Sequence, residues 1–86
     1  MTMLPITLYT RPECELCDEA RRALRAVLAG SPLLGTIQEI NIEDDPLLHK
    51  RFLTEIPALE YRGEVLAVAT SRLRIESFLE RLGGNA

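Results

Sequence analysis

Residues 4–28 read LPITLYTRPECELCDEARRALRAVL. The spacing of their apolar residues changes from that of a strand to that of a helix at a pair of cysteines. Residues 4–10 are apolar and β-branched and are followed by turn-forming residues, so they predict a β-strand. From Glu15 onward the apolar residues recur on a single helical face, which predicts an α-helix. Cys14 and Cys17 therefore stand where the first strand passes into the first helix.

The sequence downstream of this helix predicts five further elements from its alternation of apolar residues, helix caps and turn residues. They are a strand over 35–42, a short helix that begins at Asp45-Pro46 and ends before Ile56-Pro57, two strands over 58–61 and 64–69 around an Arg62-Gly63 turn, and a helix that begins after Thr70 or Ser71 and ends at Gly83. A β-α-β start requires parallel strands, whereas a hairpin adds antiparallel ones. The order β-α-β-α-β-β-α thus predicts an α/β fold, in which a four-stranded mixed sheet lies between helices on both faces as a three-layer sandwich.

Length and charge restrict the function further. A chain of 86 residues fits one domain, which we expect to span residues 1–86. Acidic residues outnumber basic ones by 13 to 10, and the arginines are dispersed, so we expect no nucleic-acid partner. No apolar run is long enough to cross a bilayer, and residues 1–5 do not resemble the start of a signal peptide. We therefore expect a cytoplasmic monomer without a membrane partner.

The two cysteines carry the chemistry. In the cytosol, a close cysteine pair is more typical of catalysis or metal binding than of a structural disulfide. Free backbone N–H groups at a helix start stabilise a thiolate on Cys14, and Cys17, one turn inside the helix, is close enough to form a disulfide with it. Arg11 favours that thiolate, whereas Glu13 and Glu15 oppose it. We predict that Cys14 attacks a substrate disulfide and that Cys17 resolves the resulting mixed disulfide.

Other uses of the cysteine pair remain open at this stage. A zinc site requires four nitrogen or sulfur ligands, but the only histidine is His49, which the second helix places away from the pair, so we expect no metal site within one chain. An iron–sulfur cluster shared between two chains would take two thiolates from each. The thiols can also be inert, in an adaptor that retains only the fold. A c-type haem is excluded because Asp18, and not histidine, follows the second cysteine.

Residues 9–17, YTRPECELC, together with Ile56-Pro57 before the hairpin, resemble the glutaredoxins of the thioredoxin superfamily over nearly the whole chain. The resemblance implies a thioredoxin fold in which the first cysteine is the nucleophile and the second resolves. It implies a cis bond before Pro57, and a backbone contact between Ile56 and an extended substrate such as the cysteine of glutathione. It also implies that Arg11 meets a glycine carboxylate and that glutathione is a possible electron donor, with no tightly bound cofactor.

Two segments differ from those of the familiar glutaredoxins. Glu15-Leu16 lies between the cysteines where those proteins have Pro-Tyr, and residues 69–72, ATSR, replace a Gly-Gly and acidic segment before the last helix. The chain is most similar to small glutaredoxin-like proteins with variable residues between the cysteines. The resemblance therefore predicts a glutaredoxin-like thiol–disulfide oxidoreductase that reduces protein or glutathione mixed disulfides.

Overall fold

The computed structural model describes residues 4–83 of the chain. In chain order, these residues form β1 (Ile6–Thr10), α1 (Glu15–Val27), the 3-10 helix η1 (Pro32–Thr36), β2 (Ile37–Asn41), the 3-10 helix η2 (Ile42–Asp44), α2 (Pro46–Phe52), β3 (Ala58–Tyr61), β4 (Glu64–Leu66) and α3 (Arg72–Arg81). The segment 1–3, part of the stretch considered for a signal peptide, lies outside the described residues. None of the described helices is long and apolar enough to cross a membrane.

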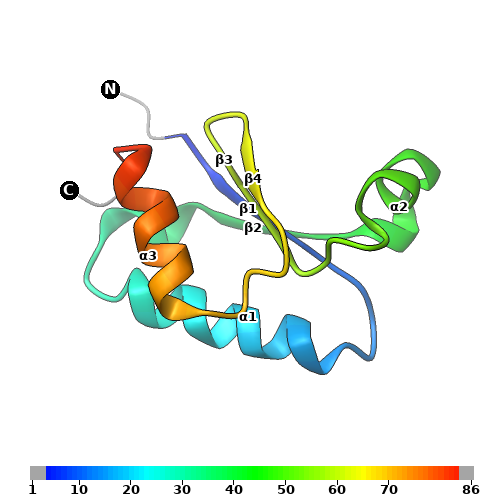
Figure 1. Cartoon of the computed structure of the whole chain (residues 1–86), viewed down its shortest axis with the longest axis horizontal. Coiled ribbons are helices and arrows are strands. Elements are labelled where there is room, and N and C mark those ends of the chain that lie inside the picture. The colour runs from blue at the N-terminus through cyan, green and yellow to red at the C-terminus, as the bar shows by residue number, and fades with distance from the viewer. Residues whose placement is uncertain (1–3, 84–86) are drawn as a thin grey trace.

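The four strands form one mixed sheet in the order β2-β1-β3-β4 (Figure 1). β1 runs parallel to β2, with Leu8 opposite Glu39, and antiparallel to β3, with Leu8 opposite Leu59. β3 and β4 form the hairpin. Its two turn residues, Arg62 and Gly63, have φ angles of 50° and 81°, the left-handed backbone that a tight hairpin turn requires. The predicted α/β fold with a mixed sheet is therefore confirmed.

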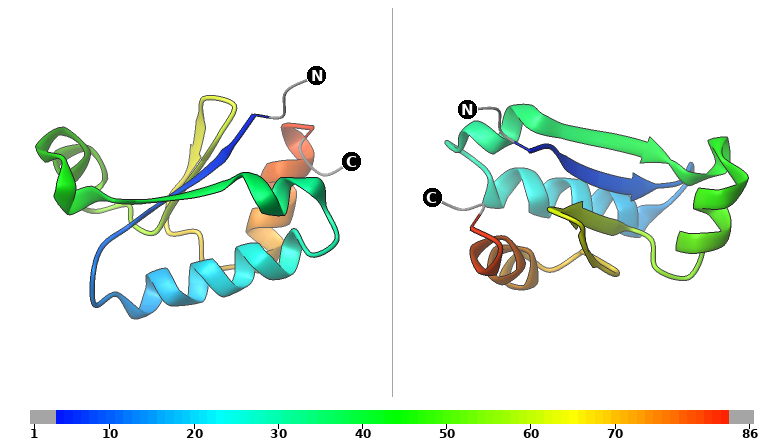
Figure 2. Two further views of the ribbon diagram at one scale, coloured as in Figure 1. Left: turned by 180° about the vertical axis from the view of Figure 1, so that it is seen from behind. Right: turned by 90° about the horizontal axis from the view of Figure 1, so that it is seen from above.

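One face of the sheet carries the main core under α1 and α3, which lie on the same side of the sheet (Figure 2). Alternate strand residues point to this face because successive side chains of a strand point to opposite sides. The members of this core include Ile6, Leu8 and Leu59 from the strands, Ala20, Leu24 and Leu28 from the first helix and its end, and Ile75 and Leu79 from α3. The apolar faces predicted for both helices thus pack against the sheet.

The opposite face carries a smaller core, which α2 covers at one end of the sheet (Figure 1). It consists of Tyr9, Ile42, Phe52 and Ala58, with half-buried apolar neighbours around them. The rings of Tyr9 and Phe52 stack with their centroids 4.2 Å apart. The third layer of the sandwich is therefore a single short helix.

The fourth strand is shorter than its sequence predicts, since it ends at Leu66 instead of extending through Ala69. Val68 has a φ of 48°, a left-handed conformation that cannot continue a strand. Its N–H donates to the Glu55 carbonyl oxygen at 2.9 Å, so the chain leaves the hairpin to pack beside the segment that follows α2. The apolar and β-branched residues of 64–69 predict a longer strand. The hydrogen bond between Val68 and Glu55 turns the chain away and ends the strand earlier.

The other element limits follow from local caps. Asp45 caps α2 with Pro46 in the first turn, and Ser71 caps α3, both as predicted. The second strand begins at Ile37, later than predicted, because Ser31 caps the 3-10 helix η1 in front of it. At the first strand, pairing begins at Ile6 and leaves the two preceding described residues outside the sheet.

Candidate functional site

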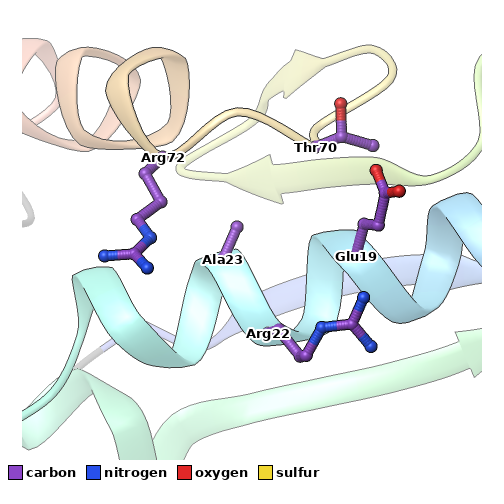
Figure 3. Close-up of a pocket in the computed structure, with 5 residues that line it drawn as sticks. All are labelled: Glu19, Arg22, Ala23, Thr70 and Arg72. Carbon is purple, nitrogen blue, oxygen red and sulfur yellow. The ribbon is translucent and has the colours of Figure 1, made fainter.

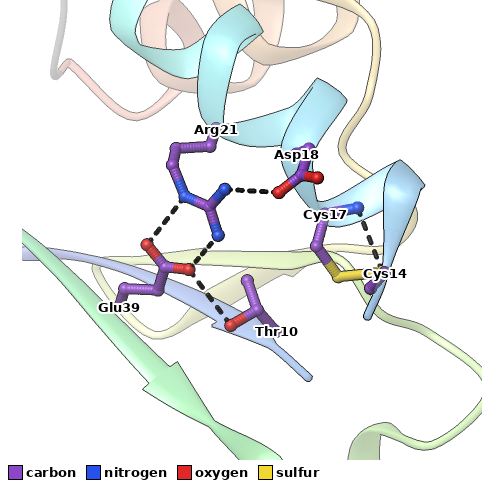
Figure 4. The surroundings of a disulfide bond; sticks show 6 residues. All are labelled: Thr10, Cys14, Cys17, Asp18, Arg21 and Glu39. Carbon is purple, nitrogen blue, oxygen red and sulfur yellow. Dashed lines mark hydrogen bonds and ion pairs between the residues drawn. A yellow bond between two sulfur atoms is a disulfide. The ribbon is translucent and has the colours of Figure 1, made fainter. Parts of the chain in front are cut away.

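Cys14 is the N-cap residue of α1. Its backbone is extended, and its sulfur accepts the Cys17 N–H at 3.1 Å, in the place where a serine or aspartate oxygen commonly accepts in other helices (Figure 4). Cys14 and Cys17 form a disulfide, with their Cα atoms 5.2 Å apart. The first sulfur therefore lies at the positive end of the helix dipole, against an N–H group that the helix leaves free.

The two sulfur-bearing residues differ in burial. Cys17, in the first turn of α1, is 1% exposed, whereas Cys14 is half-buried and lines an open hollow. Burial blocks the approach of a large substrate to Cys17 and leaves one route, through Cys14. The two sulfur atoms therefore differ in access, and Cys14 is the more accessible one.

The backbone just before Cys14 is strained. Glu13 has a φ of 54°, and a residue with a side chain in this left-handed region costs about 1–2 kcal/mol. The bend lets the chain turn sharply between the end of β1 and the start of α1. Strained residues cluster at functional sites, and Glu13 directly precedes Cys14.

The hollow beside Cys14 has a volume of about 360 Å³ and lies between the start of α1 and the segment that follows α2. It brings together three of the residues singled out from sequence, namely Arg11, Cys14 and Ile56. Pro57 follows directly and is buried, and the Ile56–Pro57 peptide bond is cis. Cys17 does not line the hollow.

Four further residues line the same hollow: Glu13, Glu15, Leu16 and Leu53. The first three are sequence neighbours of Cys14, so their presence follows from position. Leu53, the C-cap residue of α2, is not singled out by the sequence. A leucine at the end of a helix gives no signal of a site, because only the tertiary structure carries it next to the cysteine.

The segment that carries Ile56 and Pro57 is held by backbone hydrogen bonds. The Pro57 carbonyl oxygen accepts the Ala69 N–H at 2.7 Å. The Ile56 N–H donates to the Phe52 carbonyl oxygen at 3.1 Å, whereas none of the hydrogen bonds found between described residues uses the Ile56 carbonyl oxygen. Of the two backbone groups of Ile56, the carbonyl oxygen is thus the one left to take part in the backbone contact that the resemblance implies.

A polar network lies on the other side of the disulfide (Figure 4). The Arg21 guanidinium donates to Glu39 on β2, through its Nε at 3.0 Å and also through Nη2, and to Asp18 at 2.6 Å. Thr10, which is buried, donates to Glu39 at 3.3 Å. The hydrogen bonds from Arg21 lower the pKa of Glu39, and those to Glu39 and Asp18 raise the pKa of Arg21. The network joins the first turns of α1 to the sheet next to Cys17.

A second hollow, of about 300 Å³, lies between α1 and the start of α3 (Figure 3). Glu19, Arg22 and Ala23 line it from α1, and Thr70 and Arg72 line it from the other side. This lining contains no cysteine, so the sulfur chemistry belongs to the first hollow.

Metal ligands are sparse in the described part of the chain. Within residues 4–83, no group of three or more His, Cys, Asp and Glu side chains is placed to hold a metal ion. His49 lies on α2.

A mixed four-stranded sheet with three α-helices and a Cys-x-x-Cys pair at the start of α1 defines a protein of the thioredoxin-like fold. Residues 5–83 match the model of one family within this class, described as the glutaredoxin-like domain (DUF836). The chain therefore belongs to the glutaredoxin-like domain family. Family and cysteine pair together support a redox role of the thioredoxin kind.

Two solved structures of one protein are similar to this chain, both of the Northeast Structural Genomics target protein XcR50 from X. campestris. The X-ray structure is 30% identical, with a TM-score of 0.75, and the match covers 88% of this chain and 96% of that one. The solution structure is 29% identical, with a TM-score of 0.73 and coverage of 90% and 94%. A comparison with curated proteins gives no significant match.

Proposed function

We propose that this protein is a thiol–disulfide oxidoreductase that reduces disulfides through Cys14 and Cys17. One observation carries the proposal: the Cys14 sulfur lines an open hollow at the start of α1, and its disulfide partner Cys17 is buried behind it. A structural disulfide has no need for such a hollow, whereas a redox dithiol needs one accessible sulfur and one protected sulfur.

The reaction proceeds in two exchanges. The Cys14 thiolate attacks one sulfur of the substrate disulfide, which forms a Cys14–substrate disulfide and releases the first substrate thiolate. Cys17 then loses its proton and attacks the Cys14 sulfur, which forms the Cys14–Cys17 disulfide and releases the second substrate thiolate. The substrate disulfide is reduced by two electrons, and the Cys14–Cys17 dithiol is oxidised to a disulfide by the loss of the same two electrons.

The local structure favours Cys14 as the attacking group. The Cys17 N–H and the dipole of α1 stabilise a negative charge on its sulfur, and the guanidinium of Arg11 adds to this effect. The carboxylates of Glu13 and Glu15 act in the opposite direction. In the oxidised state the same N–H holds the sulfur in place for the next cycle.

Two electrons must return to the protein disulfide. Two glutathione molecules, or the dithiol of a reductase, supply them and leave as a disulfide, so the protein needs no tightly bound cofactor.

Arg11 and the segment Ile56–Pro57 contact the substrate at the hollow. A reducing cytoplasm supplies such thiols, and a monomer suffices because the site lies within one chain.

The test compares the wild type with Cys14→Ser and Cys17→Ser in the reduction of hydroxyethyl disulfide, with glutathione and glutathione reductase or with a thioredoxin reductase system as donor. We expect Cys14→Ser to lose at least about 100-fold in rate. We expect Cys17→Ser to retain the first exchange and to accumulate a covalent adduct that mass spectrometry detects. The donor that supports turnover of the wild type identifies the source of electrons.

The same preparation tests the alternative of a shared iron–sulfur cluster. Purification without oxygen, followed by an absorption spectrum and an iron assay, is expected to give a colourless protein. A brown protein that contains iron and sulfide and loses both on Cys14→Ser would contradict the proposal. Full activity in Cys14→Ser would do so as well.

A further inference from the structure

The hollow beside Cys14 has an apolar wall that no described residue covers. Leu16 is 49% exposed and Leu53 is 45% exposed, and with the half-buried Ile56 they line the hollow from α1, the end of α2 and the following segment. Large apolar side chains at the surface favour contact with another apolar group, since each Å² removed from water contributes about 25 cal/mol. A substrate that carries an aliphatic side chain next to its reactive sulfur fits this wall.

The charged part of the lining is acidic. Glu13 and Glu15 contribute two carboxylates, and Arg11 contributes the single guanidinium. Asp18, the next acidic residue along α1, is already paired with Arg21 and adds little to this excess. The hollow therefore attracts a cationic partner and repels an anionic one. Glutathione, with two carboxylates and one ammonium group, is anionic.

The backbone at the hollow adds a hydrogen-bond preference. Since the Ile56 N–H already donates to Phe52, the Ile56 carbonyl oxygen is the group left to receive a donor. An extended peptide offers such a donor in its main-chain N–H. Residues with apolar, acidic and hydrogen-bond acceptor groups thus line the hollow beside the Cys14 sulfur, and an extended peptide with an aliphatic and a basic side chain complements all three.

On the basis of the proposed function, we propose that the substrate is a protein disulfide whose cysteine lies in an extended segment, next to an aliphatic residue and beside lysine or arginine. The aliphatic side chain contacts Leu16 and Leu53, the basic side chain faces Glu13 and Glu15, and an N–H of the segment donates to the Ile56 carbonyl oxygen. The covalent step is the first exchange described above and requires no further reactant. Glutathione mixed disulfides are the poorer substrates.

The test uses the reduced wild-type protein and peptides whose cysteine is activated as a 2-pyridyl disulfide, so that released pyridine-2-thione reports the first exchange. The probes are acetyl-Lys-Leu-Cys-Lys-amide, acetyl-Glu-Leu-Cys-Glu-amide, a cationic probe with serine in place of leucine, and the glutathionyl derivative. At low salt we expect the cationic leucine probe to react about tenfold faster than the anionic one, and this ratio to fall towards unity in high salt. We expect the serine probe to be about threefold slower than its leucine counterpart.

Matched variants assign the preference to the hollow. We expect the double change Glu13→Gln and Glu15→Gln to reduce the cationic-to-anionic ratio at least about threefold. The control is Glu76→Gln with Glu80→Gln, which alters the net charge equally on exposed positions of α3, and we expect it to keep the wild-type ratio. A change in the reactivity of the Cys14 thiol affects all probes alike and cancels in the ratio.

The outcomes separate this inference from the proposed function. If 2,2′-dipyridyl disulfide, a neutral reagent, reacts rapidly at Cys14 but the cationic and anionic peptides react equally, the docking surface is wrong and the exchange chemistry stands. A glutathionyl probe that outpaces the cationic peptide would also overturn the inference. If the neutral reagent reacts no faster with the protein than with free cysteine, the proposed function itself fails.

Discussion

The two faces of the sheet are covered to different extents. Under α1 and α3 lies a core of large, fully buried side chains, whereas α2 alone covers the opposite face, and only at one end. Nearer the start of β1, Thr7 and Glu60 on that second face line an open hollow instead of packing under a helix. Most of the apolar burial that stabilises the fold is therefore on the α1 and α3 face.

The candidate site lies where these two regions meet. Cys14 caps α1, the helix that packs on the large core, and Cys17 lies in its first turn, whereas Leu53 and Ile56, on the other wall of the hollow, belong to the region of α2. A reactive pair on a rigid element keeps its geometry, and a wall on a lightly packed element can adjust to different substrates. The contrast between the faces thus separates the firmly packed element that carries the cysteine pair from the lightly packed wall that the proposed substrate would contact.

The largest effect is expected from a matched pair of leucine truncations. Leu24, 1% exposed on α1, belongs to the large core, and Leu48, half-buried on α2, packs against the small one. We expect Leu24→Ala to lower the free energy of unfolding by about 3 kcal/mol and Leu48→Ala by about 1 kcal/mol. Both changes exchange leucine for alanine in a helix, so helix propensity largely cancels.

Urea unfolding of the oxidised proteins measures both values. Equal losses would show that the small core supports the fold as strongly as the large one, and the comparison between the faces would then be wrong.

A smaller effect is expected on the α2 face from Tyr9→Phe, which keeps the ring stacked on Phe52 and removes the hydroxyl that donates to Glu60 at 2.7 Å. We expect a loss of about 1 kcal/mol at neutral pH. Burial, and then the Glu60 carboxylate, raise the pKa of Tyr9 from 10.0 to about 12. Because the folded-state pKa lies above the unfolded one, this stabilisation is complete below pH 10 and is lost as the pH rises through about 12.

Unfolding measured on both sides of pH 10 in wild type and Tyr9→Phe isolates the contribution of this hydroxyl, since the other titrating groups are common to both proteins. A difference between the two that did not shrink in alkali would argue against the Tyr9–Glu60 hydrogen bond.

The smallest effect is expected at the polar edge of the α1 face. Arg21 and Glu39 keep about a third of their side chains exposed, so we expect Arg21→Gln to cost about 0.5 kcal/mol at neutral pH. Arg21 lowers the pKa of Glu39, so the contribution is present above the ordinary value of 4.5 and is lost as the pH falls through the lower folded-state pKa.

Arg22→Gln is the control, because Arg22 makes no ion pair with any residue in the described range. Chemical unfolding between neutral and acidic pH compares the three proteins. An equal cost in both variants would mean that the Arg21 pairing adds nothing beyond the loss of one positive charge.

Local features of the fold could be predicted from sequence because they depend on neighbouring residues. The caps of α2 and α3, the Arg62-Gly63 turn and the position of the cysteine pair at the strand–helix junction all follow from this kind of information. The end of the fourth strand could not be predicted in this way. A strand-forming run includes Val68, but a hydrogen bond to Glu55 turns the chain there.

The site shows the same division. The i,i+3 spacing of Asp18 and Arg21 along the helix favours their ion pair, whereas the second partner of Arg21 is Glu39 on β2. A pairing that depends on a strand from another part of the chain has no signature in the residues of α1 alone.

The sequence by itself determined the class of fold and the position of the reactive pair, because hydrophobic period, caps and turns act over a few residues. Only the tertiary structure decided that Cys17 is buried, that Cys14 faces a hollow, and that Leu53 forms part of its wall. These properties depend on which distant segments pack around the first turn of α1. Burial and access are sums over such contacts, and no short stretch of sequence contains them.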